Sequence, residues 1–328
     1  MEKVVLVGAG GFGRCWWPGL TGSDDFEVVA VVEPDDRDRE AAAAHFGLAP
    51  DRCLLPESGD WSTLGASMMI DSSPFPFHRA NADRALAAGL DILVAKPVAP
   101  TAADATAMVE AAERAGRRIA VAQQMRYFPC FLALREVITA GVVGEPVAVT
   151  IRMALDGRGW TPGMQWRLAM AHPLLLEAGI HHLDLVRWCV GEITDVAAVS
   201  WNPPWSPFTN GDATVSAVLR TEGGVAVDYR GDFAPAAGHP AVRFDSGWDV
   251  VCTGGTVIVR DGGLFIDGEQ YKDVSTTAEP VSLEELNAAL LAAWVEAGGT
   301  GTEVPFSGRD NLRSMAALQA AIDSVVRR

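Results

Sequence analysis

The sequence predicts an α/β domain with a doubly wound parallel sheet, followed by an α+β domain with a large, mainly antiparallel open sheet. Three observations predict this order. Short apolar runs alternate with helical patterns up to about residue 122, longer segments of alternating polarity follow, and glycine-rich turn signals separate several of them. Strands that alternate with helices are typical of a parallel sheet covered on both faces, whereas alternating polarity is typical of a sheet with one covered face.

The first half contains five apolar runs that are predicted to be buried strands. Two intervening segments have helix-forming residues with apolar spacings of three and four, which predicts helices. The strands are expected at residues 4–7, 28–32, 68–70, 91–95 and 118–122, and the helices at residues 81–88 and 102–115.

The second half contains longer alternating segments, which are expected to be strands at residues 147–155, 196–201, 213–220 and 225–229. One helix is expected within this region, at residues 174–190, and two more near the end, at residues 283–296 and 309–326. We therefore predict two domains, 1–122 and 123–328. The helix at about residues 309–326 is a candidate to pack back on the first domain.

The composition narrows the classes of partner. The 328 residues have a formal net charge of −16, and such an acidic chain repels nucleic acid and anionic membrane surfaces. Five cysteines are widely spaced, which predicts free thiols in a reducing compartment rather than disulfides or a zinc site. The N-terminus opens directly into an apolar strand, and no stretch of about 18 apolar residues is present to span a bilayer. We expect a cytoplasmic protein.

A glycine motif follows the first predicted strand. Its sequence is Gly8-Ala9-Gly10-Gly11-Phe12-Gly13, which fits the GxGxxG pattern of a Rossmann dinucleotide site. Gly8 and Gly10 allow a tight turn that approaches a pyrophosphate, and Gly13 allows close packing of helix and strand. The free N–H groups at the start of the following helix then face the phosphates. The structural alternative is a glycine turn that binds no ligand.

An acidic residue supports the nucleotide interpretation. Glu33 lies 20 residues after Gly13, at the end of the next predicted strand. A carboxylate at this position accepts hydrogen bonds from both hydroxyls of the adenosine ribose and repels a 2′-phosphate, which favours NAD over NADP. Arg37 and Arg39 keep NADP as the alternative cofactor.

Other segments occur in an order that resembles the Gfo/Idh/MocA family, which includes glucose–fructose oxidoreductase-like and inositol dehydrogenase-like enzymes. Three departures are evident: Ala95 stands where the family has a glutamate before Lys-Pro, Glu177 replaces the usual aspartate, and residues 170–173 (MAHP) stand where many members have a glycine run. The matching segments are residues 72–78, GLDILVAKPVA at 89–99, QMRYF at 124–128, the Trp166-Arg167 pair, EAGIHHLD at 177–184, and the tail from 304 to 328.

The resemblance implies an NAD(P)-dependent dehydrogenase or reductase that acts on a CH–OH group of a sugar, polyol or related cyclic substrate. It implies cofactor contacts beyond the glycine turn (Gly8, Gly10, Gly11, Phe12 and Gly13) and Glu33. These additional contacts are Ser73, Pro74, His78, Lys96, Pro97, Gln124, Trp166 and Arg167.

The resemblance also suggests the catalytic groups. Lys96 would stabilise charge on the substrate oxygen, and His181 would carry its proton. In a regular helix, Glu177, His181, Asp184 and Trp188 share one face, so a histidine between two carboxylates is expected there. An ion-pair ladder on the helix surface is the alternative, and a metal site is not expected.

Substrate contacts are expected from the second domain. The candidates are Arg126, Tyr127, Trp160, His182 and Asp184, because aromatic rings suit sugar faces and charged groups suit hydroxyls. We expect a homodimer or homotetramer, since an open sheet face often pairs with another subunit. Two other functions remain open: a non-enzymatic nucleotide or sugar sensor, and an NAD-assisted hydrolase or lyase.

Overall fold

The computed structural model describes residues 1–159, 165–271 and 274–327. These residues form two compact units. The first unit comprises Met1–Gln124 and Ser282–Leu312, and the second comprises Met125–Val281 and Arg313–Arg328. This division differs from the limits 1–122 and 123–328, because residues 282–312 belong to the first unit. Those domain limits remain a prediction.

The first unit contains a six-stranded sheet in which every neighbouring pair is parallel. The strand order is β3-β2-β1-β4-β5-β6, so the direction of strand progression reverses between β1 and β4. Ligands of such sheets bind outside the carboxyl ends of the strands at this switch point. The strands are β1 (Glu2–Val7), β2 (Phe26–Val32), β3 (Cys53–Leu54), β4 (Met68–Asp71), β5 (Asp91–Ala95) and β6 (Ile119–Ala122). The predicted parallel sheet is confirmed.

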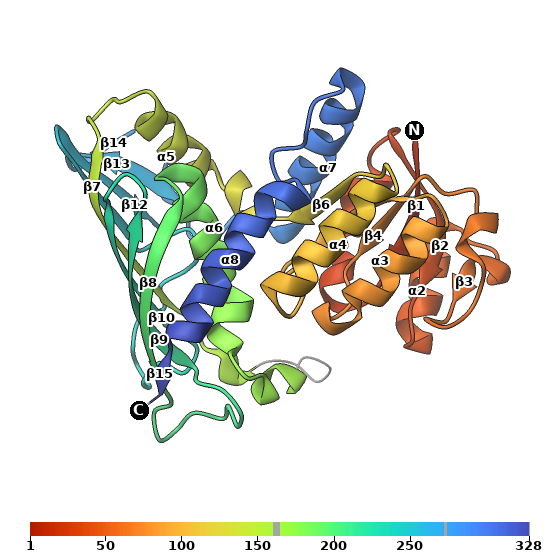
Figure 1. The fold of residues 1–328 in the computed structure, drawn as a ribbon, viewed down its shortest axis with the longest axis horizontal. Coiled ribbons are helices and arrows are strands. Elements are labelled where there is room, and N and C mark those ends of the chain that lie inside the picture. The colour runs from red at the N-terminus through yellow and green to blue at the C-terminus, as the bar shows by residue number, and fades with distance from the viewer. Residues whose placement is uncertain (160–164, 272–273, 328) are drawn as a thin grey trace. The chain divides into compact units, whose positions relative to one another are not determined.

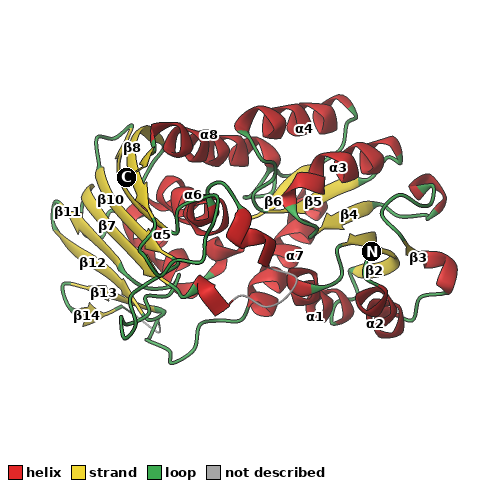
Figure 2. Cartoon of the chain, turned by 90° about the horizontal axis from the view of Figure 1, so that it is seen from below, coloured by secondary structure: helices red, strands yellow, loops and turns green. Residues whose placement is uncertain are grey.

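Helices cover both faces of this sheet. Figure 2 shows α3 and α4 on one face and α1, α2 and α7 on the other. Because both faces are covered, the strands consist almost entirely of buried apolar residues. The helices are α1 (Trp17–Thr21), α2 (Asp36–Phe46), α3 (His78–Ala87), α4 (Ala102–Arg114) and α7 (Leu283–Thr300), together with the first residues of α8 (Gly308–Ser324).

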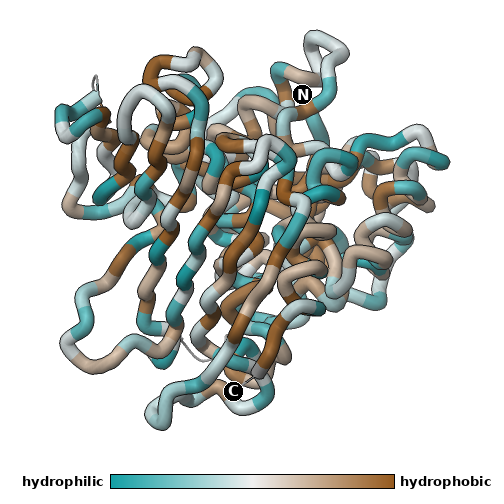
Figure 3. Tube along the Cα trace, turned by 60° about the vertical axis from the view of Figure 1, so that its left-hand side comes forward, coloured by the Kyte–Doolittle hydropathy of each residue, from teal (hydrophilic) through white to brown (hydrophobic). Residues whose placement is uncertain are grey.

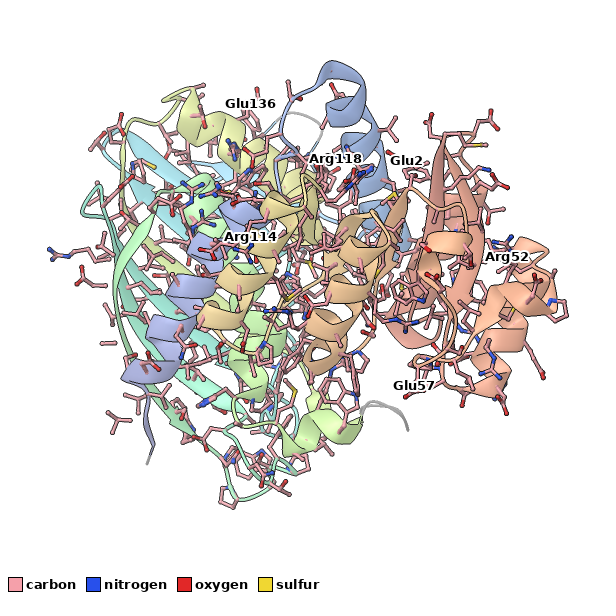
Figure 4. The ribbon with its side chains drawn as sticks, turned by 45° about the vertical axis from the view of Figure 1, so that its right-hand side comes forward. Glu2, Arg52, Glu57, Arg114, Arg118 and Glu136 are labelled. Atoms are coloured by element: carbon pink, nitrogen blue, oxygen red, sulfur yellow. The ribbon has the colours of Figure 1, made fainter. Side chains whose placement is uncertain are left out.

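One arginine connects α7 with the sheet of the first unit. The Arg118 guanidinium donates to Asp91 from Nε (2.6 Å) and to Glu2 from an Nη atom (3.0 Å). The Cζ atom of Arg118 also lies over the ring of Trp294, in α7, at 4.1 Å from the ring centre. Figure 4 shows Arg118 and Glu2 beside each other. The contact connects two strands with a ring that lies 176 residues after Arg118 in the sequence, and no local pattern indicates such a contact.

The second unit contains a nine-stranded mixed sheet that is mainly antiparallel, as predicted. Only the pairs β7–β10 and β8–β15 are parallel in the part of the chain that the structure describes. The strand order is β14-β13-β12-β11-β7-β10-β9-β8-β15. The strands are β7 (Pro146–Ala154), β8 (Ile193–Trp201), β9 (Thr214–Thr221), β10 (Ala226–Asp232), β11 (Trp248–Cys252), β12 (Gly255–Arg260), β13 (Gly263–Ile266), β14 (Glu269–Gln270) and β15 (Val326–Arg327).

One face of this sheet is covered by α5 (Pro129–Thr139), α6 (Ile180–Cys189) and the later part of α8 (Figure 1). Along β10 and β11, buried residues alternate strictly with exposed ones, so these strands have one covered face and one open face. Figure 3 shows hydrophobic and hydrophilic residues mixed along the strands.

Several elements differ from the prediction. Helix α2 was not predicted because it has no apolar stripe and buries only Ala42. Helix α5 and strands β11 to β13 were also missed, although α5 buries Cys130, Phe131, Leu134 and Val137 at helical spacing. The helix expected at 174–190 begins as a π-helical turn, Leu175–Gly179, before α6.

Candidate active site

The glycine turn lies at the carboxyl end of β1, where the strand order reverses. Gly8 has a φ of +75°, and a Cβ atom there would lie 2.7 Å from the backbone nitrogen of Ser73. A Cβ atom on Gly13 would overlap the carbonyl oxygen of Gly8. Gly11 also has a positive φ (+47°), and a Cβ atom there would have no neighbouring atom within 4 Å. Gly8 and Gly13 are therefore required for the close packing of the turn on its own backbone, and Gly11 leaves open space beside the turn.

The remaining motif residues have supporting contacts. A Cβ atom on Gly10 would overlap the carboxylate of Asp38, which in turn accepts a hydrogen bond from Arg14 (2.6 Å). The ring of Phe12 meets that of Trp16 edge to face, with ring centres 6.2 Å apart. Trp16 donates from its indole nitrogen to the Ser72 hydroxyl (2.8 Å), which connects the turn to the loop after β4.

The side chain of Glu33 binds the backbone of the glycine turn. Its carboxylate accepts hydrogen bonds from the backbone N–H groups of Ala9 (2.8 Å), Gly10 (3.2 Å) and Asp35 (3.0 Å). The residue is only 7% exposed. Glu33 therefore stabilises the glycine turn, a role that was not predicted from the sequence. Its predicted contact with the ribose hydroxyls remains a prediction.

His78 connects two segments that are predicted to contact the cofactor. One ring nitrogen lies 2.8 Å from the carbonyl oxygen of Ser73, and the other lies 3.2 Å from that of Val98. The ring is buried. Pro74 is exposed beside Ser73 on the loop. Both partners are carbonyl oxygens, and the ring lies between the two loops that carry them.

Lys96 follows the last residue of β5 and is half-buried, and Pro97 after it is buried. The Lys96–Pro97 peptide bond is cis. Gln124 follows β6 at the same edge of the sheet, and its side-chain oxygen is buried without a hydrogen-bond partner among the described residues. Gly8, Ser73, Lys96 and Gln124 thus follow the carboxyl ends of four parallel strands. The carboxyl ends of parallel strands lie at one edge of the sheet, which is where ligands bind.

The π-helical turn changes the expected face of α6. Glu177 lies within this turn, so its spacing to His181 is not that of a regular α-helix. Its carboxylate lies 3.0 Å from the guanidinium of Arg167, which also lies over the ring of Trp166. Asp184 forms an ion pair with Arg126 (2.6 Å). Each carboxylate near His181 therefore has an arginine partner, which the regular-helix interpretation did not anticipate.

The adjacent histidines differ in their surroundings. His181 is 2% exposed, and its ring meets Phe244 edge to face at 5.8 Å between centres. His182 stacks on Phe244 at 5.3 Å and also contacts Tyr229 (5.3 Å). Burial lowers the pKa of His182 to about 3, although a backbone contact with Ala178 opposes part of this shift. His182 is therefore neutral near pH 7.

The other predicted substrate residues vary in accessibility. Arg126 and Asp184 are buried against each other, and His182 lies among aromatic rings, so these contacts do not support direct substrate binding. Tyr127 is half-buried. Trp160 lies outside the described residues. Among the described residues, no cluster of three or more metal-ligating side chains occurs, and no helix is both long and apolar enough to cross a membrane.

Two models of one family match this chain. The model described as "Oxidoreductase family, NAD-binding Rossmann fold" matches residues 2–123, and the model described as "GFO/IDH/MocA C-terminal domain" matches residues 131–258. The chain belongs to the GFO/IDH/MocA family. It is accordingly an NAD-binding oxidoreductase of that family, and the resemblance inferred from the sequence is confirmed.

Several proteins of this type are similar to the chain over nearly its whole length. D-apiose dehydrogenase of Paraburkholderia graminis is 28% identical over 97% of this chain and 86% of the relative. Inositol 2-dehydrogenase 1 of Saccharopolyspora erythraea is 28% identical over 98% and 93%. An oxidoreductase from Agrobacterium radiobacter, solved in complex with NAD+, L-tartaric acid and magnesium, shares the fold with a TM-score of 0.86. It is 22% identical, and the match covers 98% of this chain and 96% of that one.

The residues of this GFO/IDH/MocA protein fit NAD. The absence of a side chain at Gly11 leaves open space beside the turn for a pyrophosphate, and the unpartnered oxygen of Gln124 offers a buried acceptor. Two further residues were not predicted from the sequence: Asp38, which covers Gly10, and Asp71, which accepts from the backbone N–H of Ser73 (2.9 Å). Asp38 could have been found as the third residue after the helix cap Asp35, a spacing typical of a helix N-terminus.

Replacing Glu33 with glutamine is expected to weaken NAD binding in this family member. The amide keeps the size but replaces one acceptor oxygen with a donor, which opposes the N–H groups of the glycine turn. We expect the Kd for NAD to rise about ten-fold, equivalent to about 1.4 kcal/mol, and the preference for NAD over NADP to fall. Calorimetric titration with both cofactors measures the effect. Glu27→Gln, on an exposed part of β2, is the matched control; an unaltered Kd for Glu33→Gln would contradict the assignment.

Proposed function

We propose that this chain oxidises a secondary hydroxyl of a sugar, polyol or related cyclic substrate with NAD, or catalyses the reverse reduction. The observation that carries the proposal is the position of Lys96. It follows β5 at the edge of the sheet that also bears the glycine turn, and His78 holds the segment immediately after it. The names of the relatives, D-apiose dehydrogenase and inositol 2-dehydrogenase, support a polyhydroxylated substrate.

NAD, when bound, supplies the hydride acceptor for the oxidation. The residues of the chain then have to manage the oxygen of the substrate. In the proposed mechanism, the ammonium group of Lys96 stabilises negative charge that develops on this oxygen, and His181 accepts the hydroxyl proton. Glu177 is proposed as the third catalytic residue, together with Lys96 and His181. Tyr127 is proposed to contact the substrate. The ion pair of Glu177 with Arg167 fixes the position of that carboxylate.

A panel of sugars, inositols, keto-sugars and aminosugars tests this function. Each compound is scored by the change in nicotinamide absorbance with NAD and with NADP. Reduction of NAD with at least one polyhydroxylated compound would support the proposal. If NAD stays bound through turnover without net reduction, the chain is instead an NAD-assisted hydrolase or lyase. Binding without turnover across the panel would favour a sensor.

We also propose that a second copy of this chain covers the open face of the nine-stranded sheet. Exposed Asp228 and Asp249 lie in register across β10, β7 and β11, and exposed Arg230 and Arg152 form the next row. A two-fold axis that lies between the two stacked sheets, parallel to the rows and midway between them, places the acids of one copy over the arginines of the other. Val218 in the acidic row is 56% exposed, which adds apolar surface to the interface.

Reversing one charge is expected to weaken this association. Asp228→Arg places like charges opposite each other in the paired faces, so sedimentation should show a shift towards the monomer. The double variant Asp228→Arg/Arg230→Asp restores the complementarity and should recover the larger species. If the wild-type chain is monomeric at micromolar concentration, or if the single variant sediments as the wild type does, the proposed interface is wrong.

A further inference from the structure

The carboxylate of Asp184 is the centre of a buried network in the second unit. The residue lies in α6, three positions after His181, and is 1% exposed. Arg126 donates to Oδ2 from Nε (2.6 Å) and to Oδ1 from an Nη atom (2.7 Å). The hydroxyl of Ser314 donates to Oδ1 as well (2.6 Å). Both oxygens are thus engaged, and the fork-to-fork contact with the arginine fixes the orientation of the carboxylate.

A second arginine extends the network. Arg187 donates to the Ser314 hydroxyl (2.5 Å), and its guanidinium lies 3.7 Å from Asp184. It also donates to both carboxylate oxygens of Glu192 (2.7 and 3.0 Å). Arg313 also lies 3.4 Å from Glu192, so three arginines and two carboxylates meet in this network.

The partners of Asp184 occupy particular places in the chain. The first unit ends at Gln124, after β6, and again at Leu312, within α8. Arg126 is the second residue of the second unit after Gln124, and Ser314 is the second residue after Leu312. One carboxylate thus holds three segments of the second unit: the start of residues 125–281, the start of residues 313–328, and the helix that bears His181.

We propose that Asp184 is a positioning residue that fixes His181 by anchoring α6 to the first residues of these two segments. The inference rests on the proposed proton-transfer role of His181. Asp184 acts through the helix and does not touch the substrate. A displacement of about 1 Å at a reacting group is enough to lower a rate about a hundred-fold. A helix whose preceding turn is π-helical depends on such tertiary anchors for its register.

The anchor itself is tested by hydrogen–deuterium exchange, without any assay of activity. Ser314→Ala removes one hydroxyl and leaves the ion pair of Asp184 with Arg126, so the protein is expected to fold. Asp184→Asn weakens the contacts of this side chain with Arg126, Ser314 and Arg187. Exchange should become about ten-fold faster in three separate segments together, at residues 125–128, 180–189 and 313–317. Asp323→Asn, an exposed carboxylate on the same helix as Ser314, is the control. Faster exchange confined to the segment that bears the substitution would overturn the anchor.

The positioning role is tested by the kinetics of the folded variants with NAD and a substrate from the panel. For Ser314→Ala we expect kcat to fall about ten-fold while the Kd for NAD stays within two-fold of the wild type, because the glycine turn lies in the first unit. The deuterium isotope effect on kcat should rise, since hydride transfer becomes more rate-limiting. A merely structural role lowers the amount of active enzyme and leaves the isotope effect unchanged, which would overturn the proposal. A wild-type enzyme without activity on the panel would overturn the proposed function and with it the role of His181, whereas the exchange data would still decide whether the anchor exists.

Discussion

Replacing Lys96 with alanine is expected to lower kcat by about 10²- to 10⁴-fold, the usual contribution of a positioned group that manages charge or a proton. The ammonium group is removed from the edge of the sheet where the glycine turn lies, so charge that develops on the substrate oxygen is no longer stabilised. The Kd for NAD should change much less than kcat. Steady-state kinetics and calorimetric titration on the same preparation measure the two quantities.

Two further variants define what Lys96 contributes. Lys96→Arg keeps a positive charge but has a larger, planar head, so it should retain more activity than Lys96→Ala. Added methylammonium should restore part of the activity of Lys96→Ala, because the small amine fits the space that the side chain leaves. The sequence has only three lysines, Lys3, Lys96 and Lys272. Lys3→Ala, which removes an exposed ion pair with Glu27, is the matched control. If Lys96→Ala is as active as Lys3→Ala, the catalytic assignment is wrong.

Replacing His181 with glutamine is expected to have an effect of similar size, a fall in kcat of about 10²- to 10⁴-fold. In the oxidation direction the imidazole accepts the hydroxyl proton, and the amide of glutamine cannot replace it as a base. Steady-state kinetics with NAD and one substrate of the panel measure the loss. Calorimetric titration of the same preparation should give a Kd for NAD close to that of the wild type.

The adjacent histidine provides the comparison. Burial lowers the pKa of His182 to about 3, so this ring is neutral near pH 7. His182→Phe keeps an aromatic ring among Phe244, Tyr229 and Trp248. It should therefore lose far less activity than His181→Gln. The opposite result, in which His182→Phe lowers kcat more than His181→Gln does, would exchange the proposed roles.

The prediction of elements from the sequence succeeded where local chemistry decides the conformation. The apolar run at residues 4–7 lies in β1, and the glycine motif after it forms the expected turn, because positive φ angles and close backbone approach leave little choice but glycine. Helix α2 was missed for the complementary reason. Its burial is limited to Ala42, so the sequence carries no periodic apolar signal there.

The sequence by itself determined the order of the two sheets, the NAD turn and the family, because each depends on residue types at fixed short spacings. Only the tertiary structure decided which charged groups meet. Arg118 connects Glu2 and Asp91 with the ring of Trp294, and Asp184 meets both Arg126 and Ser314. These partners are separated by up to 176 residues in the printed sequence. A buried charge needs a partner of opposite sign, but sequence spacing does not indicate which of many candidates the fold brings within hydrogen-bond distance.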